Sequence, residues 1–267
     1  MLSSLLWQLV PPEDAPQTAP SYLFGTMHVR DLRAFEWMGL VEQYMSGCAV
    51  FATEFDFSEM DQSALGAALR LPEGYDLETL LGRGAWKRLQ RVAENNPYLP
   101  AATLRWQHPM AISTALSATN LSNESPHSLD EALWHLANHL GLQTTGVETF
   151  ADQLQTLRSI DLQTHTRQLS GLLKRQYGHQ RHVGRMLEQY RRGDIQALYK
   201  SAKRETHGLR YALIYRRNAL MALRFIEIAR EQPLFCAVGA AHLAGAKGML
   251  RLLKHAGFRL KTVTIDN

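Results

Sequence analysis

The chain has 267 residues, of which 45% are hydrophobic and 20% charged, a composition typical of globular proteins long enough to bury a sizeable core. Its formal net charge is +4, without a lysine block or a basic stripe interleaved with aromatic residues, so nucleic acid is not an expected partner. No run approaches the roughly 18 apolar residues of a membrane span, so the sequence predicts no integral membrane segment.

The first residues and the cysteines give no sign of an oxidising compartment. The opening segment MLSSLLWQLVPPEDAPQ has no basic start, and its apolar stretch is too short for a secretion signal. Cys48 and Cys236 lie in apolar runs and are interpreted as small core residues. The chain as given is therefore predicted to be cytoplasmic; a periplasmic or extracellular place stays open if a signal was removed.

The first part of the chain alternates strand and helix. Residues 4–10 and 21–26 predict a hairpin joined by the turn-rich loop PPEDAPQTAP. Residues 33–46 have the apolar spacing of a helix. Residues 48–55, CAVFATEF, form an apolar run typical of a strand buried on both faces. Glu54, near the end of that run, is a charge that the apolar pattern does not predict.

The middle of the chain is rich in helical patterns. Residues 101–119 have the dense small and apolar residues of a buried helix. Residues 128–140, SLDEALWHLANHL, begin with an N-cap serine and have Glu131 three residues later, which predicts a capping box. Residues 144–148, TTGVE, predict a short strand that ends in a second carboxylate, Glu148.

The C-terminal part returns to strands. After helical patterns, the stretch PLFCAVGAAH contains a strand, residues 243–255 predict a helix, and FRLKTVTI predicts the last strand. The predicted fold class is therefore α/β, with a central mixed or parallel sheet, flanking helices and a large helical insertion. We expect a single domain over residues 1–267, with helical insertions at about 58–140 and 150–230.

One unit recurs at the two ends of the chain: a strand, a glycine, two further residues and a histidine. It contains Gly25 and His28 in SYLFGTMH, and Gly239 and His242 in LFCAVGAAH. A glycine there could let the chain turn sharply or bring its backbone close to a ligand. Ligands of parallel sheets bind at the carboxyl ends of the strands, so two neighbouring strands would aim both imidazoles into one crevice.

Carboxylates end two further predicted strands, at Glu54 and Glu148, and can point to the same place. Two histidines with one or two glutamates make a plausible divalent-metal site. They could equally be a general acid–base set that uses no metal. A single histidine or glutamate at a strand end is more often structural, and the recurrence of the Gly-x-x-His unit is what favours a functional interpretation.

A third element of the candidate site begins the helical stretch YRRNALMALRFIEIA, residues 215–229. Arg216, Arg217 and Asn218 lie at its start. An arginine in such a place usually pairs with a surface carboxylate, but it could instead clamp a substrate carboxylate or polarise a carbonyl group.

Together these segments resemble the TraB/GumN family, which includes plasmid pheromone-shutdown proteins and the Tiki metalloproteases of animals. The resemblance extends from about Leu6 to Val263 and is most specific at AVGAAHL. The segments that carry it are SYLFGTMHVRD, TEFD, LDEALWHLANHLGLQTTGVETFADQL, YRRGD, RRNALMA and FCAVGAAHLAGAKGMLRLLKHAGFRLKTV.

The resemblance implies an α/β fold similar to the erythromycin-esterase and ChaN-like group. It implies catalytic residues His28, Glu54, Arg217 and His242, of which the two histidines and the glutamate would also bind the metal. It further implies a divalent cofactor, manganese or cobalt.

The leading functional hypothesis is a divalent-metal-dependent hydrolase that acts on peptides, with a peptide or small molecule as its substrate. Gly25, Gly239, Glu148 and Asn218 are expected to support the ligands or the substrate. Two alternatives stay open. One is a protein that binds or sequesters a peptide or pheromone without cleaving it, and the other is a metal-free, esterase-like hydrolase with a histidine as base.

Overall fold

The structure, a computed structural model, describes residues 4–94, 96, 99, 101–118, 125–206 and 209–264, with only the backbone described at 117–118 and 176–180. The chain forms two compact units. The first unit, which we call the sheet unit, comprises Met1–Glu59, Asn123–Gln153 and Met186–Asn267. The second, the helical unit, comprises Met60–Ser122 and Leu154–Arg185.

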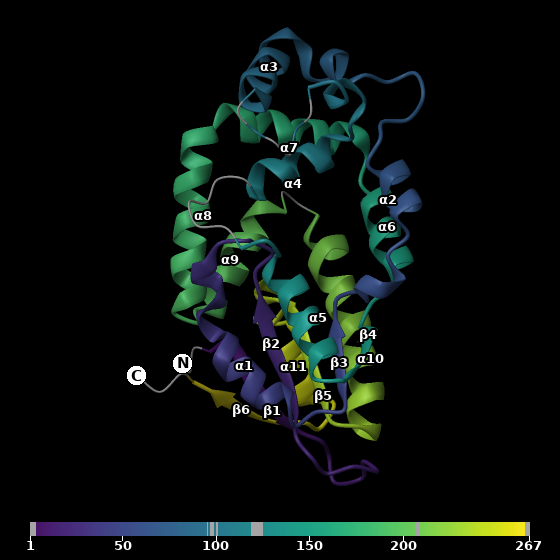
Figure 1. The fold of residues 1–267 in the computed structure, drawn as a ribbon, viewed down its shortest axis with the longest axis vertical. Coiled ribbons are helices and arrows are strands. Elements are labelled where there is room, and N and C mark those ends of the chain that lie inside the picture. The colour runs from purple at the N-terminus through teal and green to yellow at the C-terminus, as the bar shows by residue number, and fades with distance from the viewer. Residues whose placement is uncertain are drawn as a thin grey trace. The chain divides into compact units, whose positions relative to one another are not determined.

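A mixed sheet forms the centre of the sheet unit, with its described strands in the order β4-β3-β5-β2-β1-β6 (Figure 1). The pairs β2–β5, β5–β3 and β3–β4 are parallel, whereas β1 is antiparallel to both β2 and β6. This arrangement confirms the predicted α/β class and the N-terminal hairpin. The bounds are β1 (Leu6–Val10), β2 (Ser21–Thr26), β3 (Val50–Thr53), β4 (Gln143–Gly146), β5 (Leu234–Gly239) and β6 (Arg259–Val263).

The parallel strands β2, β3 and β5 are buried along nearly their whole length, as their apolar runs predict. Phe235 lies in the middle of an aromatic cluster, with ring centroids 6.1 Å from Tyr22, 6.4 Å from Phe24 and 6.3 Å from Phe51. Burial of these large rings fixes the order of the three strands, and therefore the place where their carboxyl ends meet.

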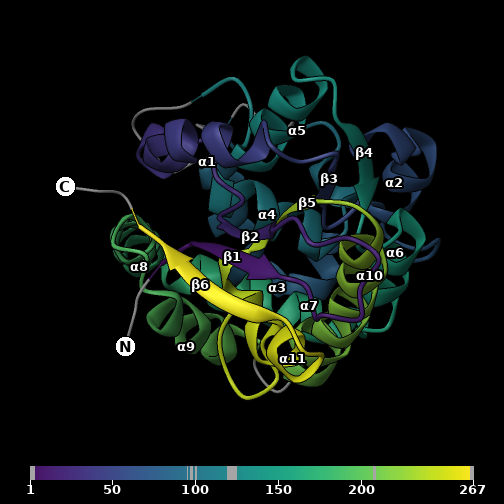
Figure 2. The same cartoon turned by 90° about the horizontal axis from the view of Figure 1, so that it is seen from below.

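Helices cover both faces of this sheet. Figure 2 shows α1 and α5 on one face and α9, α10 and α11 on the other. The described helical segments of the sheet unit are η1 (Leu32–Trp37), α1 (Met38–Met45), η2 (Phe57–Glu59), α5 (Leu129–His139), α9 (Ile195–Glu205), the π-helix η4 (Tyr211–Arg216), α10 (Arg217–Glu231), η5 (Ala240–His242) and α11 (Met249–His255).

The helical unit has a hydrophobic core of its own, in which α7 packs against α3 and α4. Its described helices are α2 (Gln62–Ala68), α3 (Leu77–Ala93), η3 (Leu104–Trp106), α4 (Pro109–Ala118) and α7 (Leu162–Lys174). Two more, α6 (Phe150–Arg158) and α8 (Gln176–Arg191), continue from one unit into the other along the chain. Within the described residues, no helix has the length and apolar character to span a membrane.

Helix boundaries differ from the sequence prediction at three places. The helix predicted over 33–46 is a 3-10 helix from Leu32 to Trp37 and an α-helix only from Met38, and residue 119, the end of another predicted helix, lies outside the described residues. The helix predicted over 101–119 begins only at Pro109, because Gln107 is extended and bridges to Arg70. The helix predicted over 243–255 begins at Met249, after a turn in which Gly245 has a φ of +97°. The capping box at the start of α5 is confirmed.

Candidate functional site

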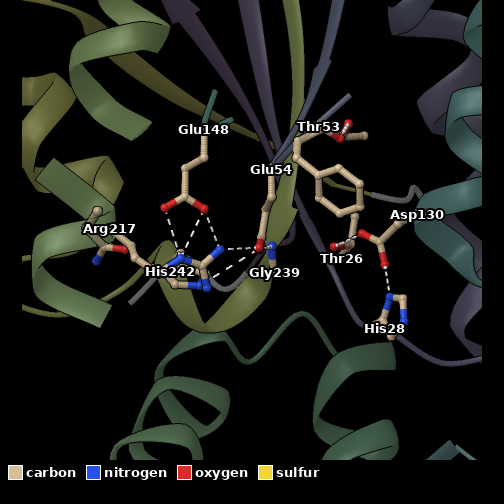
Figure 3. A network of polar contacts seen from close by, with 11 residues as sticks. Thr26, His28, Thr53, Glu54, Asp130, Glu148, Arg217, Gly239 and His242 are labelled. Carbon is tan, nitrogen blue, oxygen red and sulfur yellow. Dashed lines mark hydrogen bonds and ion pairs between the residues drawn. The ribbon is translucent and has the colours of Figure 1, made fainter. Parts of the chain in front are cut away.

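Four parallel strands deliver the candidate residues to one edge of the sheet. Glu54 follows β3 directly, and His28, Glu148 and His242 come two or three residues after β2, β4 and β5. Thr26, the last residue of β2, pairs with Gly239, the last residue of β5. Figure 3 shows the resulting group of side chains at the carboxyl ends of the strands.

The carboxylate of Glu54 is held by a backbone amide and a guanidinium group. Its Oε1 accepts a hydrogen bond of 2.9 Å from the amide nitrogen of Gly239, and its Oε2 accepts one of 2.6 Å from Arg217. Burial tends to raise the pKa of Glu54. The charge of Arg217 outweighs this effect, together with His242 and the hydrogen bond from the Gly239 amide, and the pKa of Glu54 falls to about 2. Glu54 is therefore an anion at neutral pH.

Arg217, the first residue of α10, bridges Glu54 and Glu148. Its Nε donates to both oxygens of Glu148 at 2.9 and 3.0 Å, and its Nη2 contacts Glu148 at 2.5 Å. Burial tends to lower the pKa of Arg217, but the two carboxylates raise it well above its ordinary value. For Glu148, burial outweighs the arginine and raises the pKa. The adjacent Arg216 is exposed, so Arg217 is the arginine that belongs to this group.

His242 is buried, and one of its ring nitrogens is fixed by an amide. Nδ1 lies 2.6 Å from Oδ1 of Asn218, whose Nδ2 donates to the backbone oxygen of Lys247 at 2.6 Å. Because the amide oxygen can only accept, Nδ1 carries the proton and Nε2 has a free lone pair, 3.8 Å from Oε1 of Glu54. Burial lowers the pKa of His242 to about 4, so the imidazole is neutral at pH 7.

His28 is held in a similar way but lies in a more exposed place. Its Nδ1 is 3.1 Å from Oδ2 of Asp130 in α5, and Oδ1 of Asp130 accepts a 2.6 Å hydrogen bond from Thr26. The side chain of His28 is 69% exposed. The hydrogen bond with Asp130 raises the pKa of His28. The two histidines of the repeated unit thus have pKa values shifted in opposite directions.

The two glycines of the repeated unit are required by close packing. Neither has a positive φ, so the expected sharp turn is not the reason for them. A Cβ atom on Gly25 would lie 3.0 Å from Cα and Cβ of Ala240, and one on Gly239 would lie 3.2 Å from Oε1 of Glu54. The small residues bring β2 against the turn after β5 and let Glu54 reach the backbone.

The donor types at this edge fit a divalent ion only in part. Two ligands of one ion at about 2.0–2.2 Å lie no more than about 4.4 Å apart, a condition that His242 Nε2 and Glu54 Oε1 meet at 3.8 Å. Both histidines are anchored at Nδ1 by a side-chain oxygen, as metal-binding histidines commonly are. Within the described ranges, however, no three His, Cys, Asp or Glu side chains form a group that could hold a metal.

Sequence reasoning did not identify Asp130 and Thr26, which hold His28. Asp130 lies inside the capping box of α5, where an acidic residue is explained by the helix N-terminus alone. Only the packing of α5 beside the strands reveals its second contact. Asn218 was expected to support the site, and its contact with His242 gives that expectation a specific geometry.

Comparisons with known proteins find relatives that match nearly the whole chain. A model of the TraB/PrgY/gumN family matches residues 5–262. The chain is 25% identical to Metalloprotease TIKI2 of Danio rerio, covering 97% of this chain and 61% of that protein. It is 24% identical to Metalloprotease TIKI1 of Homo sapiens, covering 97% and 62%. The chain thus spans about three fifths of the length of these relatives. No solved structure matches.

Proposed function

Since the chain belongs to the TraB/PrgY/gumN family, we propose that it hydrolyses peptides with the help of a divalent metal at the carboxyl edge of β2, β3 and β5. One observation carries the proposal: Nε2 of the neutral His242 lies 3.8 Å from the ionised Glu54, and His28, also anchored at Nδ1, follows a strand at the same edge. The name of these relatives, metalloprotease, supports both the peptide substrate and the metal.

In this proposal His242, Glu54 and His28 would hold the ion, with manganese or cobalt as the candidates that the family resemblance implies. A divalent ion bound there would supply a Lewis acid for the scissile carbonyl and a water molecule of lowered pKa. Glu54 is suited to the ligand role because Arg217 and the Gly239 amide keep it ionised. His242 is suited because its neutral Nε2 is free to donate a lone pair.

Arg217 orients the reacting group in this proposal. Its Nε and Nη2 are occupied by the two glutamates, whereas Nη1 has no acceptor among the residues that the structure describes. A cation fixed by two carboxylates needs little reorganisation before it stabilises a developing oxyanion. We therefore assign Nη1 of Arg217 to the substrate carbonyl oxygen, and Glu148 to holding the guanidinium in place.

A metal-free hydrolase is the second candidate, and the opposite pKa shifts of the two histidines favour it. His242, with a pKa of about 4, is neutral and could take a proton from water. His28, with a raised pKa, could return a proton to the leaving group. The same residues then act as base and acid without an ion.

Metal analysis and peptide cleavage on one preparation distinguish these candidates. A mixture of random ten-residue peptides is incubated with the purified protein, with protein treated with a chelator, and with chelator-treated protein to which manganese or cobalt has been added back. The products are identified by mass spectrometry. Cleavage that chelation abolishes and the metal restores supports the proposal. Cleavage that resists chelation favours the metal-free hydrolase, and retained but intact peptides favour a binding protein. His242→Gln should abolish cleavage, and the exposed His139→Gln should not.

A further inference from the structure

A group of cations and tyrosines lies beside the candidate site, in the sheet unit. It comprises Lys203 and Tyr199 of α9, Arg210 and Tyr215 at the π-helix η4, and Lys247 in the turn after η5. We call these five residues the basic cluster. Three chain segments distant in sequence contribute to it, so its composition does not reflect a local run of basic residues.

Specific contacts hold the basic cluster together. The hydroxyl groups of Tyr199 and Tyr215 lie 3.3 Å apart, and Nζ of Lys247 lies 5.2 Å from the centroid of the Tyr215 ring. The guanidinium of Arg210 lies near enough to the Tyr215 hydroxyl to lower its pKa. The Tyr199 ring packs directly on Gly245, where any Cβ atom would clash with it. The positive φ of this glycine makes the position doubly unfavourable for other residues.

Among the described residues, no carboxylate pairs with the positive charges of the basic cluster. Other arginines of the sheet unit have carboxylate partners, for example Arg191 with Glu36 and Arg224 with Glu227. Within the described part of the chain, Lys203, Arg210 and Lys247 form no ion pair. The pKa of Tyr215 is lowered by its hydrogen bond with Tyr199 and by the charges of Lys203 and Arg210, as expected beside unpaired cations.

One side chain connects the basic cluster to the candidate site. Asn218 donates its amide N–H to the backbone oxygen of Lys247 and accepts from Nδ1 of His242, both at 2.6 Å. The backbone of Lys247 is therefore linked to His242 through a single amide group. The π-helix that carries Tyr215 ends directly before Arg217, and such helices often occur at functional sites.

We propose that the basic cluster binds a carboxylate group of the peptide substrate. Lysine and arginine with nearby hydroxyl donors are the groups that recognise carboxylate oxygens. The cluster offers three cations and two hydroxyls, and the backbone of its Lys247 is linked to His242 through Asn218. The inference rests on the proposed peptide hydrolysis, because it assigns part of the same substrate. The carboxylate has two sources, the free C-terminus of a peptide or the side chain of an aspartate or glutamate.

A binding experiment tests this without requiring cleavage. Four mixtures of random ten-residue peptides are each equilibrated with immobilised protein. Two mixtures contain Asp and Glu and two lack them, and in each pair one mixture has a free C-terminus and the other an amidated C-terminus. Retained peptides are quantified by mass spectrometry. We expect retention of carboxylate-bearing peptides about tenfold above neutral, amidated ones. If peptides that lack Asp and Glu are retained better with a free than with an amidated C-terminus, the bound carboxylate is the C-terminus. If amidated peptides are retained better with Asp and Glu than without them, the bound carboxylate is a side chain.

Two matched variants test whether the basic cluster is responsible for the preference. The cluster variant Lys203→Gln/Arg210→Gln/Lys247→Gln should lose the preference. The control variant Lys254→Gln/Arg259→Gln/Lys261→Gln removes two exposed lysines and one exposed arginine elsewhere in the sheet unit, and it should keep the preference. If the triple cluster variant does not fold, Lys247→Gln alone should reduce the preference at least threefold. Equal retention of acidic and neutral peptides by the unaltered protein, or equal loss in both triple variants, overturns the inference.

The outcomes also separate this inference from the proposed function. Cleavage of peptides without any preference for carboxylates contradicts the role of the basic cluster and leaves the hydrolase proposal standing. A carboxylate preference without cleavage under any metal condition contradicts the hydrolase proposal and supports a peptide-binding protein that uses the basic cluster.

Discussion

The amide oxygen of Asn218 lies 2.6 Å from Nδ1 of His242, and this contact decides which nitrogen of the imidazole is free. Asn218 is fully buried, and its own orientation is fixed by the hydrogen bond that its Nδ2 donates to Lys247. The Nε2 atom of His242 therefore faces Glu54 as an unprotonated lone pair. A neutral amide fixes the tautomer without adding the negative charge that Asp130 brings to His28.

Asn218→Asp tests this difference. A carboxylate in place of the amide favours the imidazolium form, so we expect the pKa of His242 to rise from about 4 by about 1–3. Titration of the histidine ring protons by NMR on metal-free protein measures the change. The pKa of His28 in the same spectra should stay constant, and an unchanged pKa of His242 would show that the contact with residue 218 is absent in solution.

Arg217→Met tests the bridge between Glu54 and Glu148. Removal of the cation leaves two adjacent carboxylates at a largely buried place without their partner, which typically costs about 3–5 kcal/mol in the free energy of unfolding. Denaturant unfolding measures the loss. Arg216→Met removes the exposed neighbour and should change the free energy by no more than about 0.5 kcal/mol. Equal effects of the two variants would contradict the bridge.

Gly25→Ala tests the close packing of β2 against the turn after β5. The new methyl group would lie 3.0 Å from two atoms of Ala240, so we expect a destabilisation of about 1–3 kcal/mol from overpacking. Thermal and denaturant unfolding measure it. Gly39→Ala in α1 is the control, because a Cβ atom there meets nothing within 4 Å and should be neutral or stabilising. A stable Gly25→Ala protein would argue against tight contact at this point.

A pair of histidines makes the helical unit sensitive to acid. The rings of His108 and His165 lie 4.9 Å apart, and burial with the neighbouring His165 lowers the pKa of His108 to about 4. Between pH 6.5 and 4 the unfolded chain binds a proton at His108 that the folded protein does not, so stability is complete above pH 6.5 and falls as the pH falls. Because His108 is only half buried, we expect a loss of no more than about 2 kcal/mol.

Hydrogen exchange of amides in α4 and α7 measures this loss against pH. His108→Asn keeps a side chain that can cap α4 but cannot titrate, and it should flatten the dependence. A wild-type curve that is already flat between pH 6.5 and 4 would contradict the assignment.

The sequence predicted the parts of the site that depend on local patterns. The apolar runs of β2, β3 and β5 locate the strands, and the residues just after them locate His28, Glu54 and His242. Since parallel strands share a carboxyl edge, one further assumption, that the strands are neighbours, was enough to bring these residues to one place. The pairing of β5 with both β2 and β3 meets that assumption.

The contacts that define the chemistry depend on long-range packing and were not predictable in the same way. Nothing in the pattern around Arg217 distinguishes it from Arg216 until α10 is placed beside Glu54 and Glu148. The contact of Asp130 with His28 was not predictable either, because its place in the first turn of α5 already accounts for its charge. The close contact of Gly25 with Ala240, more than two hundred residues away in the chain, is hidden from the local pattern for the same reason.

Glu54→Gln is the most direct test of a catalytic site at this edge of the sheet. It keeps the size of the side chain and removes its charge, while Arg217 remains bonded to Glu148. Metal content, peptide hydrolysis and free energy of unfolding are measured on the same preparations, with Glu227→Gln in an exposed ion pair as the control. The account predicts a folded protein whose hydrolysis falls by about 10²–10⁴-fold. A variant that unfolds easily yet keeps its metal and full activity per folded molecule would contradict it.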